Sequence, residues 1–173
     1  MNALAQTYPQ LAVQLTATGW SGAQLSAIGD AHELACQLFA GAERGSGKPF
    51  IDHLVGTASA TVLGGGDATV VGAALLHAAY DQGDFGTGRV GPTPRHRRTV
   101  SSAVGSEVDE LVLGYHRLAW PPTTEGLSSA SPGGEARPDG AGTAPAVLLI
   151  RVANEIDDAS DGALVISGKA GFP

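Results

Sequence analysis

Apolar residues recur along the chain at intervals of three and four positions in several segments, and strict alternation over the length of a strand is hard to find. Intervals of three and four place side chains on one face of an α-helix, whereas alternation places them on one face of a strand. The pattern therefore predicts an all-α fold. A chain of 173 residues can form one compact core, so we expect a single domain over 1–173.

Helix start and stop signals give the bounds of the predicted helices. Ser21 and Asp67 are suitable N-caps, and the glycines at 64–66 are a stop signal. The predicted helices cover 21–42, 52–63, 67–81, 95–104, 106–118 and 146–160. The side chains expected to face the core on the first and third of them are Leu25, Ile28, Ala35, Leu38, Phe39, Val70, Val71, Ala74, Leu75 and Ala78.

Residues 121–145 differ in composition from the helical segments. They include five prolines and five glycines and almost no bulky side chain. Such a segment buries too little apolar surface to offset the entropy of ordering it, so the composition predicts a flexible loop. The tail after Ser160 shows no clear period.

The formal net charge is −7, which opposes a general role in binding nucleic acid or an anionic membrane. The first twenty residues lack the features of a signal peptide, and no run of eighteen apolar residues occurs. We therefore expect a cytoplasmic protein whose partner is a small molecule, and the oligomeric state stays open. Cys36, the single cysteine, is flanked by apolar residues and is expected to be buried.

Two histidines on predicted helices, His53 and His77, are candidate site residues. A lone histidine on an apolar face is commonly a core residue, but acids accompany these two. Asp81 follows His77 by four positions, so on one helix face its carboxylate would orient the imidazole as a general base. On the last helix Arg151, Asn154, Glu155 and Asp158 form a polar stripe, which is either part of a site or a solvated face.

The segment 89–98 concentrates positive charge in an acidic protein. It holds Arg89, Arg95, Arg97 and Arg98 together with His96. Guanidinium groups bind phosphate or carboxylate through paired hydrogen bonds, so the cluster is a candidate anion site. The alternative is a solvated helix start.

The segment "RGSGKPFIDHLVGTASATVLGGGDATVVGAALLHAAYD" resembles the hydrolase portion of the bifunctional ppGpp synthetase/hydrolases, within the HD superfamily of metal-dependent phosphohydrolases. That family has an Arg-x-Ser-Gly-x-Pro-Tyr turn, a metal-binding histidine, and an "AALLHD" helix ending in a Glu-Asp pair. "VGSEVDELVLGYHRL" is similar to the family's next segment, and "LLIRVANEID" resembles its closing helix. The resemblance spans about 30–158 and implies an HD-like helical bundle.

The resemblance also implies roles for individual residues. His53 matches the first metal ligand and His77 the histidine of the HD doublet, while Ala78 and Asn154 stand where the family has ligating aspartates. The remaining matches are Asp81 and Gln82 at the catalytic Glu-Asp pair, and Arg44 and Ser46 at the turn that reaches the nucleotide base.

The two missing carboxylates change the expected chemistry, because two imidazoles and an amide carry no negative charge for a hard dication. We expect either no cofactor or a divalent metal (Mn, Fe or Zn) held weakly by His53 and His77. The leading hypothesis is a divergent HD-like enzyme that acts on a small polar or anionic molecule in an interhelical pocket. His53, His77 and Asp81 would supply general acid–base chemistry, with substrate contacts from Arg44, Ser46, Tyr80, Gln82, Asn154 and Arg151.

Two alternatives stay open. One is a catalytically inactive module that binds a nucleotide-like anion, with Arg44 and the arginines of 89–98 as contacts. The other is a metal-dependent phosphohydrolase in which Asn154 and a replacement acid complete the metal site.

Overall fold

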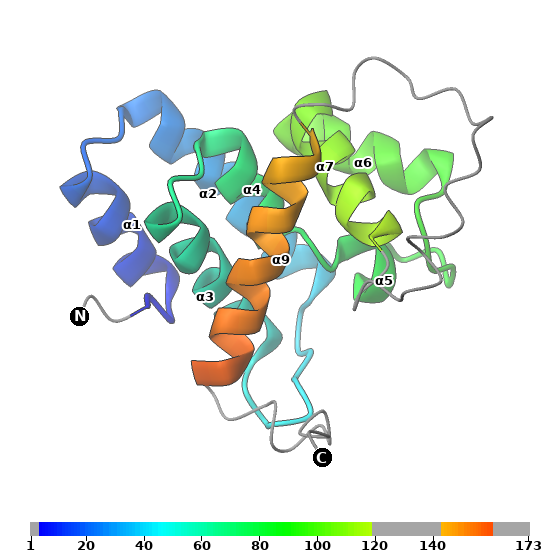
Figure 1. Ribbon diagram of the computed structural model, residues 1–173. Coiled ribbons are helices and arrows are strands. Elements are labelled where there is room, and N and C mark those ends of the chain that lie inside the picture. The colour runs from blue at the N-terminus through cyan, green and yellow to red at the C-terminus, as the bar shows by residue number, and fades with distance from the viewer. Residues whose placement is uncertain (1–3, 119–142, 161–173) are drawn as a thin grey trace, which may run out of the picture.

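A computed structural model describes residues 4–118 and 143–160 (Figure 1). Within these ranges the chain is helical, with one isolated bridge between Glu43 and Pro49 and no strand, which confirms the all-α prediction. The helices are α1 (Tyr8–Ala17), α2 (Gly22–Leu38), α3 (Phe50–Leu63), α4 (Ala68–Leu75), α5 (Ala79–Gln82), α6 (Pro94–Val104), α7 (Ser106–Arg117) and α9 (Thr143–Ser160).

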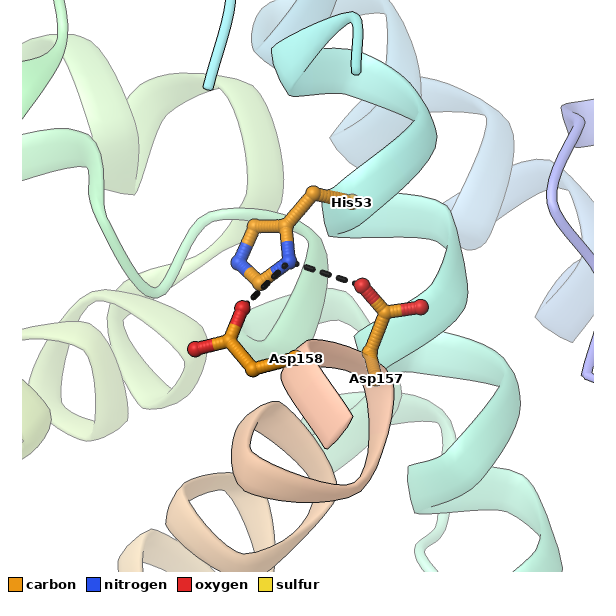
Figure 2. Close-up of side chains that lie close together, drawn as sticks. All are labelled: His53, Asp157 and Asp158. Atoms are coloured by element: carbon orange, nitrogen blue, oxygen red, sulfur yellow. Dashed lines mark hydrogen bonds and ion pairs between the residues drawn. The ribbon is translucent and has the colours of Figure 1, made fainter. Parts of the chain in front are cut away.

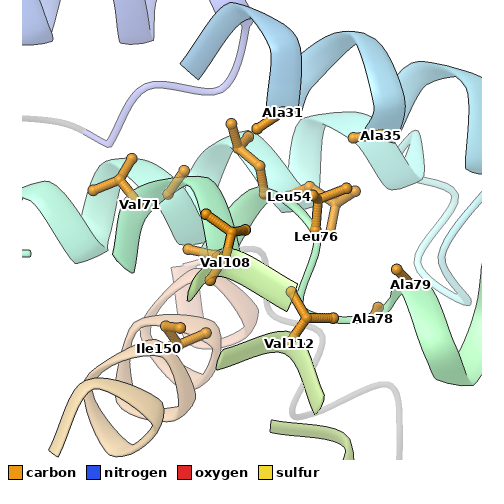
Figure 3. Packing of buried hydrophobic residues seen from close by; sticks show 14 of the residues in the cluster. Ala31, Ala35, Leu54, Val71, Leu76, Ala78, Ala79, Val108, Val112 and Ile150 are labelled. Carbon is orange, nitrogen blue, oxygen red and sulfur yellow. The ribbon is translucent and has the colours of Figure 1, made fainter. Parts of the chain in front are cut away.

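Helices α3 and α4 occupy the middle of the bundle. α9 packs along α3, α4 and α7, while α1 covers α3, and α2 covers α4 (Figure 1). The core between them is built from small and medium apolar side chains, among them Leu54 of α3, Val71 of α4 and Ile150 of α9, all fully buried (Figure 3). No helix in the described ranges is long and apolar enough to cross a membrane.

The predicted helix over 67–81 is broken in the structure. Asp67 caps its start as expected, accepting a hydrogen bond from the Val70 amide at 3.0 Å, but α4 ends at Leu75 and α5 begins at Ala79. The ring of His77 contacts the Ala74 carbonyl at 2.8 Å. A continuous helix would pair that carbonyl with the amide four residues on, so the side chain competes with the backbone at the break.

In the N-terminal part of the chain the structure differs from the prediction in two helices. α1 was not predicted, although Pro9 lies in its first turn and the Gln10 side chain accepts hydrogen bonds from the backbone at Gln6 and Thr7. α2 ends at Leu38 rather than near 42, because the chain turns at Gly41, whose φ of 71° suits glycine. Its cap at Ser21 is confirmed.

Other predictions fall partly or wholly outside the described residues. Of the predicted loop 121–145, residues 121–142 lie outside them, and 143–145 belong to the first turn of α9. The tail 161–173 also lies outside them. Cys36 is exposed on α2, so its predicted burial is wrong: it lies on the face of the helix turned away from the core, where its sulfur is 3.6 Å from Nε2 of His32.

The contact between α3 and α9 depends on a glycine. Asp157 of α9 is fully buried against Gly56 of α3. A β-carbon at position 56 would fall 1.8 Å from Oδ1 of Asp157 and 2.5 Å from its Cγ, well inside van der Waals contact. α9 can therefore lie this close to α3 only because residue 56 has no side chain.

Replacing Gly56 by alanine is expected to lower the free energy of unfolding by about 2–4 kcal/mol, since the buried carboxylate must move from its partners. Gly72→Ala is the matched control, because it also lies inside a helix but its added carbon would meet Val108 at an ordinary 3.7 Å. That variant should be neutral or more stable by about 0.5–1 kcal/mol. Urea unfolding of both variants checks the prediction, and equal effects would contradict it.

Candidate functional site

A pocket of about 470 Å³ opens where the turn after α2, the α4–α5 break, α7 and α9 meet. This volume suits a small molecule. The side chains around it mix both charges with neutral polar and aromatic groups. Its lining residues are Glu43, Arg44, Gly45, Phe50, His77, Ala78, Asp81, Gln82, Tyr115, Arg151, Asn154 and Asp158.

His53 lies beneath this pocket on α3 and is fully buried. Its Nδ1 is 2.8 Å from Oδ2 of Asp157 and 3.6 Å from Oδ1 of Asp158 (Figure 2). A carboxylate only accepts hydrogen bonds, so Nδ1 carries the hydrogen. The other ring nitrogen, Nε2, is buried and has no hydrogen-bond partner among the described residues.

Asp157 was not predicted as a site residue, yet its carboxylate contacts three side chains. Besides His53, the Lys48 ammonium lies 3.1 Å from both of its oxygens, and the Gln6 amide donates to Oδ1 at 3.2 Å. Burial acts to raise the pKa of Asp157, but the hydrogen bond from His53 and the charge of Lys48 outweigh it and hold the pKa below its usual value. Asp157 is therefore an ionised, internally neutralised carboxylate that fixes the orientation of His53.

Asp158, the next residue, is also neutralised within the protein. Its carboxylate pairs with the guanidinium of Arg44, which also lies over the ring of Phe50 at 5.7 Å from the centroid. Further along α9, Arg151 pairs with Glu155 and donates to the Tyr115 hydroxyl at 3.0 Å. Three residues of the polar stripe, Arg151, Asn154 and Asp158, thus line the pocket, and Glu155 is the ion-pair partner of Arg151.

His77 lies in the break between α4 and α5 and is 3% exposed. The Ala74 carbonyl can only accept, so Nδ1 carries the hydrogen and Nε2 keeps a lone pair. Burial, followed by the nearby His53, Arg44 and Arg151, lowers the pKa of His77 to about 3. Its ring lies edge to face with that of His53, the centroids 5.3 Å apart. At neutral pH it is an uncharged nitrogen donor.

Three predicted site residues behave differently from expectation. Asp81 does not orient His77, because the break after α4 separates the two residues; it accepts instead from Nδ1 of His116 at 2.7 Å. Tyr80 points away from the pocket, and its hydroxyl donates to buried Asp109, while burial raises the pKa of the phenol. Ser46 lies in the turn after α2 but not among the pocket residues.

The remaining predicted residues do come together. His77, Asp81, Gln82, Arg44, Arg151 and Asn154 line the pocket, and His53 lies in ring contact with His77. Sequence reasoning missed Asp157, Lys48 and Tyr115. A usable signal for Asp157 was its spacing: it follows Asn154 by three residues and so lies on the same side of α9.

Residues 31–136 match the model of the HD domain family. This is more than half of the chain, which therefore belongs to the HD domain family, and the predicted HD superfamily membership is confirmed. Among curated proteins, no sequence matches this chain. Membership of this family indicates a hydrolase-like fold, and HD domains typically bind a divalent metal.

The donor atoms fit such a metal in part. Metal-binding histidines characteristically donate their second ring nitrogen to a carboxylate or a backbone carbonyl, as His53 and His77 both do here. Ligand atoms of His53, Asp157 and Asp158 also lie within 4.8 Å of one another. However, Lys48 and Arg44 already neutralise these two carboxylates. The nitrogen donors therefore fit a metal, whereas the acidic donors are engaged elsewhere.

Acid should destabilise the protein through His77. Its folded pKa of about 3 lies below the unfolded value of about 6.5, so the unfolded chain binds the proton first and stability falls as the pH drops through this interval. Between pH 6.5 and 4.5 the loss from this group is about 2–3 kcal/mol.

Urea unfolding at both pH values, with a chelator present, measures this loss. His77→Gln should lower the pH dependence by that amount whatever its own stability, because glutamine does not titrate. An unchanged pH dependence in the variant would show that His77 is not held neutral by its surroundings.

Proposed function

We propose that this protein is a hydrolase-like HD enzyme that acts on a small anionic molecule in the pocket, with Nε2 of His53 and His77 as the ligands of a weakly held divalent metal. The observation that carries the proposal is the buried Nε2 of His53, which has no partner among the described residues. Leaving a buried polar atom unpaired costs about 1–3 kcal/mol, a cost that a metal bond would remove.

His77 suits the role of ligand better than that of a general base. A general base is most effective when its pKa lies near the working pH, and a pKa of about 3 lies far below neutrality. A metal ligand, by contrast, must be neutral and keep its lone pair, and the Ala74 carbonyl holds the ring in that tautomer. We therefore place His77 with the metal rather than in proton transfer.

The donor set also bears on which metal would bind. Imidazole suits zinc and iron, whereas manganese and magnesium prefer carboxylate and carbonyl oxygens. Here Ala78 stands at one acidic position, Asn154 offers a neutral amide oxygen, and Asp158 is paired with Arg44. We infer a preference for zinc or iron over manganese. When bound, such a metal would act as a Lewis acid and lower the pKa of its water.

The charges around the pocket support an anionic substrate. Arg44 and Arg151 both line it and are held in place by acidic partners on α9. Gln82 and Asn154 add neutral donors, and the phenol of Tyr115 accepts from Arg151. Because phosphate and carboxylate groups bind guanidinium groups well, we propose phosphate esters as the first substrate class to assay. A ppGpp-type nucleotide remains a prediction from sequence resemblance.

Metal binding tests the proposal directly. The purified chain, dialysed to equilibrium against zinc or iron(II), should bind about one equivalent, and His53→Ala and His77→Ala should each lose at least tenfold in affinity. His32→Ala is the matched control, because His32 stacks on Tyr8 outside the pocket. Binding that is equal in all four proteins, or absent from the parent, would refute the metal proposal.

A second candidate function is metal-free binding of the same class of anion. The pairing of Asp157 with Lys48 and of Asp158 with Arg44 favours it, because these two acids of α9 are already compensated and attract a cation less strongly. Calorimetry with a phosphate ester in chelator distinguishes the two functions. Under this alternative binding persists without metal and without hydrolysis, and Arg151→Gln should weaken it about tenfold, while exposed Arg117→Gln should not. Metal-dependent turnover would contradict it.

A further inference from the structure

A second hollow, separate from the pocket above, lies where the loop before α6 meets the first two turns of that helix. Its volume is about 580 Å³. Three of its side chains are arginines and none is acidic, although the whole protein has a net charge of −7. The lining residues are Gly86, Thr87, Arg89, Thr93, Pro94, Arg95, His96 and Arg98.

The four arginines of this segment divide into two groups. Arg97 is structural: it donates to buried Asp109 at 2.9 Å through Nε and ties α6 to α7. Arg89, Arg95 and Arg98 are exposed and make no ion pair within the part of the chain that the structure describes. A structural ion pair thus explains Arg97 but not the three arginines that line the hollow.

The loop that carries Arg89 is fixed in place by a buried histidine. His96 is 1% exposed; its Nδ1 donates to the Gly91 carbonyl at 2.7 Å, and its Nε2 accepts from the Thr87 hydroxyl at 2.7 Å. The ring also stacks on Phe85, with centroids 4.2 Å apart. The loop and the helix are therefore joined, so that Arg89 of the loop and Arg95 and Arg98 of the helix line one hollow.

The acid beside this loop in sequence does not neutralise the arginines. Asp84 accepts a hydrogen bond from the Gly86 amide at 2.7 Å and is not one of the lining residues. Three like charges around one concavity repel each other, and a bound anion would relieve that repulsion. The start of α6 adds a weaker attraction of the same sign.

We propose that this hollow is a second binding site, specific for the oligophosphate group of a small molecule. Three guanidinium groups around a concave surface match an anion with several charges and many acceptor oxygens better than a single carboxylate. A hollow of this size holds a small molecule, and the acidic character of the rest of the chain opposes a nucleic acid. The site does not depend on the function proposed for the first pocket.

The test is a titration of the full chain with pyrophosphate in the presence of a chelator. Backbone amide chemical shifts, measured by NMR at each step, report the binding. We expect saturable shifts at residues 86–98, with a dissociation constant below about 1 mM. Arg95→Gln and Arg98→Gln should each weaken binding roughly five- to tenfold. Arg117→Gln, which removes the same charge from an exposed site on α7, should change it less than about twofold.

Each contrary result overturns the proposal. Shifts confined to residues 43–45 and 151–158 would place the anion in the first pocket instead. Equal weakening by Arg117→Gln would show unspecific attraction to positive charge, and no saturable shift would show no site. Because the three variants alter exposed side chains, all should fold, and circular dichroism checks this.

Discussion

The buried carboxylate of Asp157 is the contact on which the rest of the site depends. It draws together Gln6 near the N-terminus, Lys48 after α2, and His53 on α3. A buried charge is stable only when it is paired and hydrogen-bonded, so all of these groups are needed together. Through this contact α9 is held against α3, and the imidazole of His53 is held with its hydrogen toward the acid and its free nitrogen turned the other way (Figure 2).

Charge neutrality within the bundle governs the chemistry that the pocket can support. Asp157 is balanced by Lys48, Asp158 by Arg44, and Glu155 by Arg151. This arrangement satisfies the acids of α9 without a cation from solution, in contrast to a metal site built on several carboxylates. The groups that remain are the imidazoles of His53 and His77 in ring contact, of which His77 is held neutral, and a rim of amide, phenol, guanidinium and carboxylate groups. Such a set favours a metal that accepts imidazole nitrogen, and it favours anion recognition.

Much of the fold could be predicted because helical periodicity and caps are local signals, and the caps at Ser21 and Asp67 act where expected. The pocket positions of His77, Arg44 and Asn154 could also be predicted, through a family resemblance. The break at 76–78 could not, because it follows from a side chain taking a backbone acceptor. The partners of Asp157, Asp81 and Tyr80 depend on residues distant in sequence, which periodicity does not register.

The absence of a side chain at Gly56 has an evolutionary consequence. Only hydrogen fits between α3 and the carboxylate of Asp157, so any larger residue at 56 requires a smaller one at 157, or a helix that lies farther away. Losing the acid would in turn leave the Lys48 ammonium and Nδ1 of His53 without that partner. Positions 56 and 157 should therefore change together among relatives of this chain. In relatives that keep both Gly56 and Asp157, we expect the imidazole of His53 to have the same orientation as here.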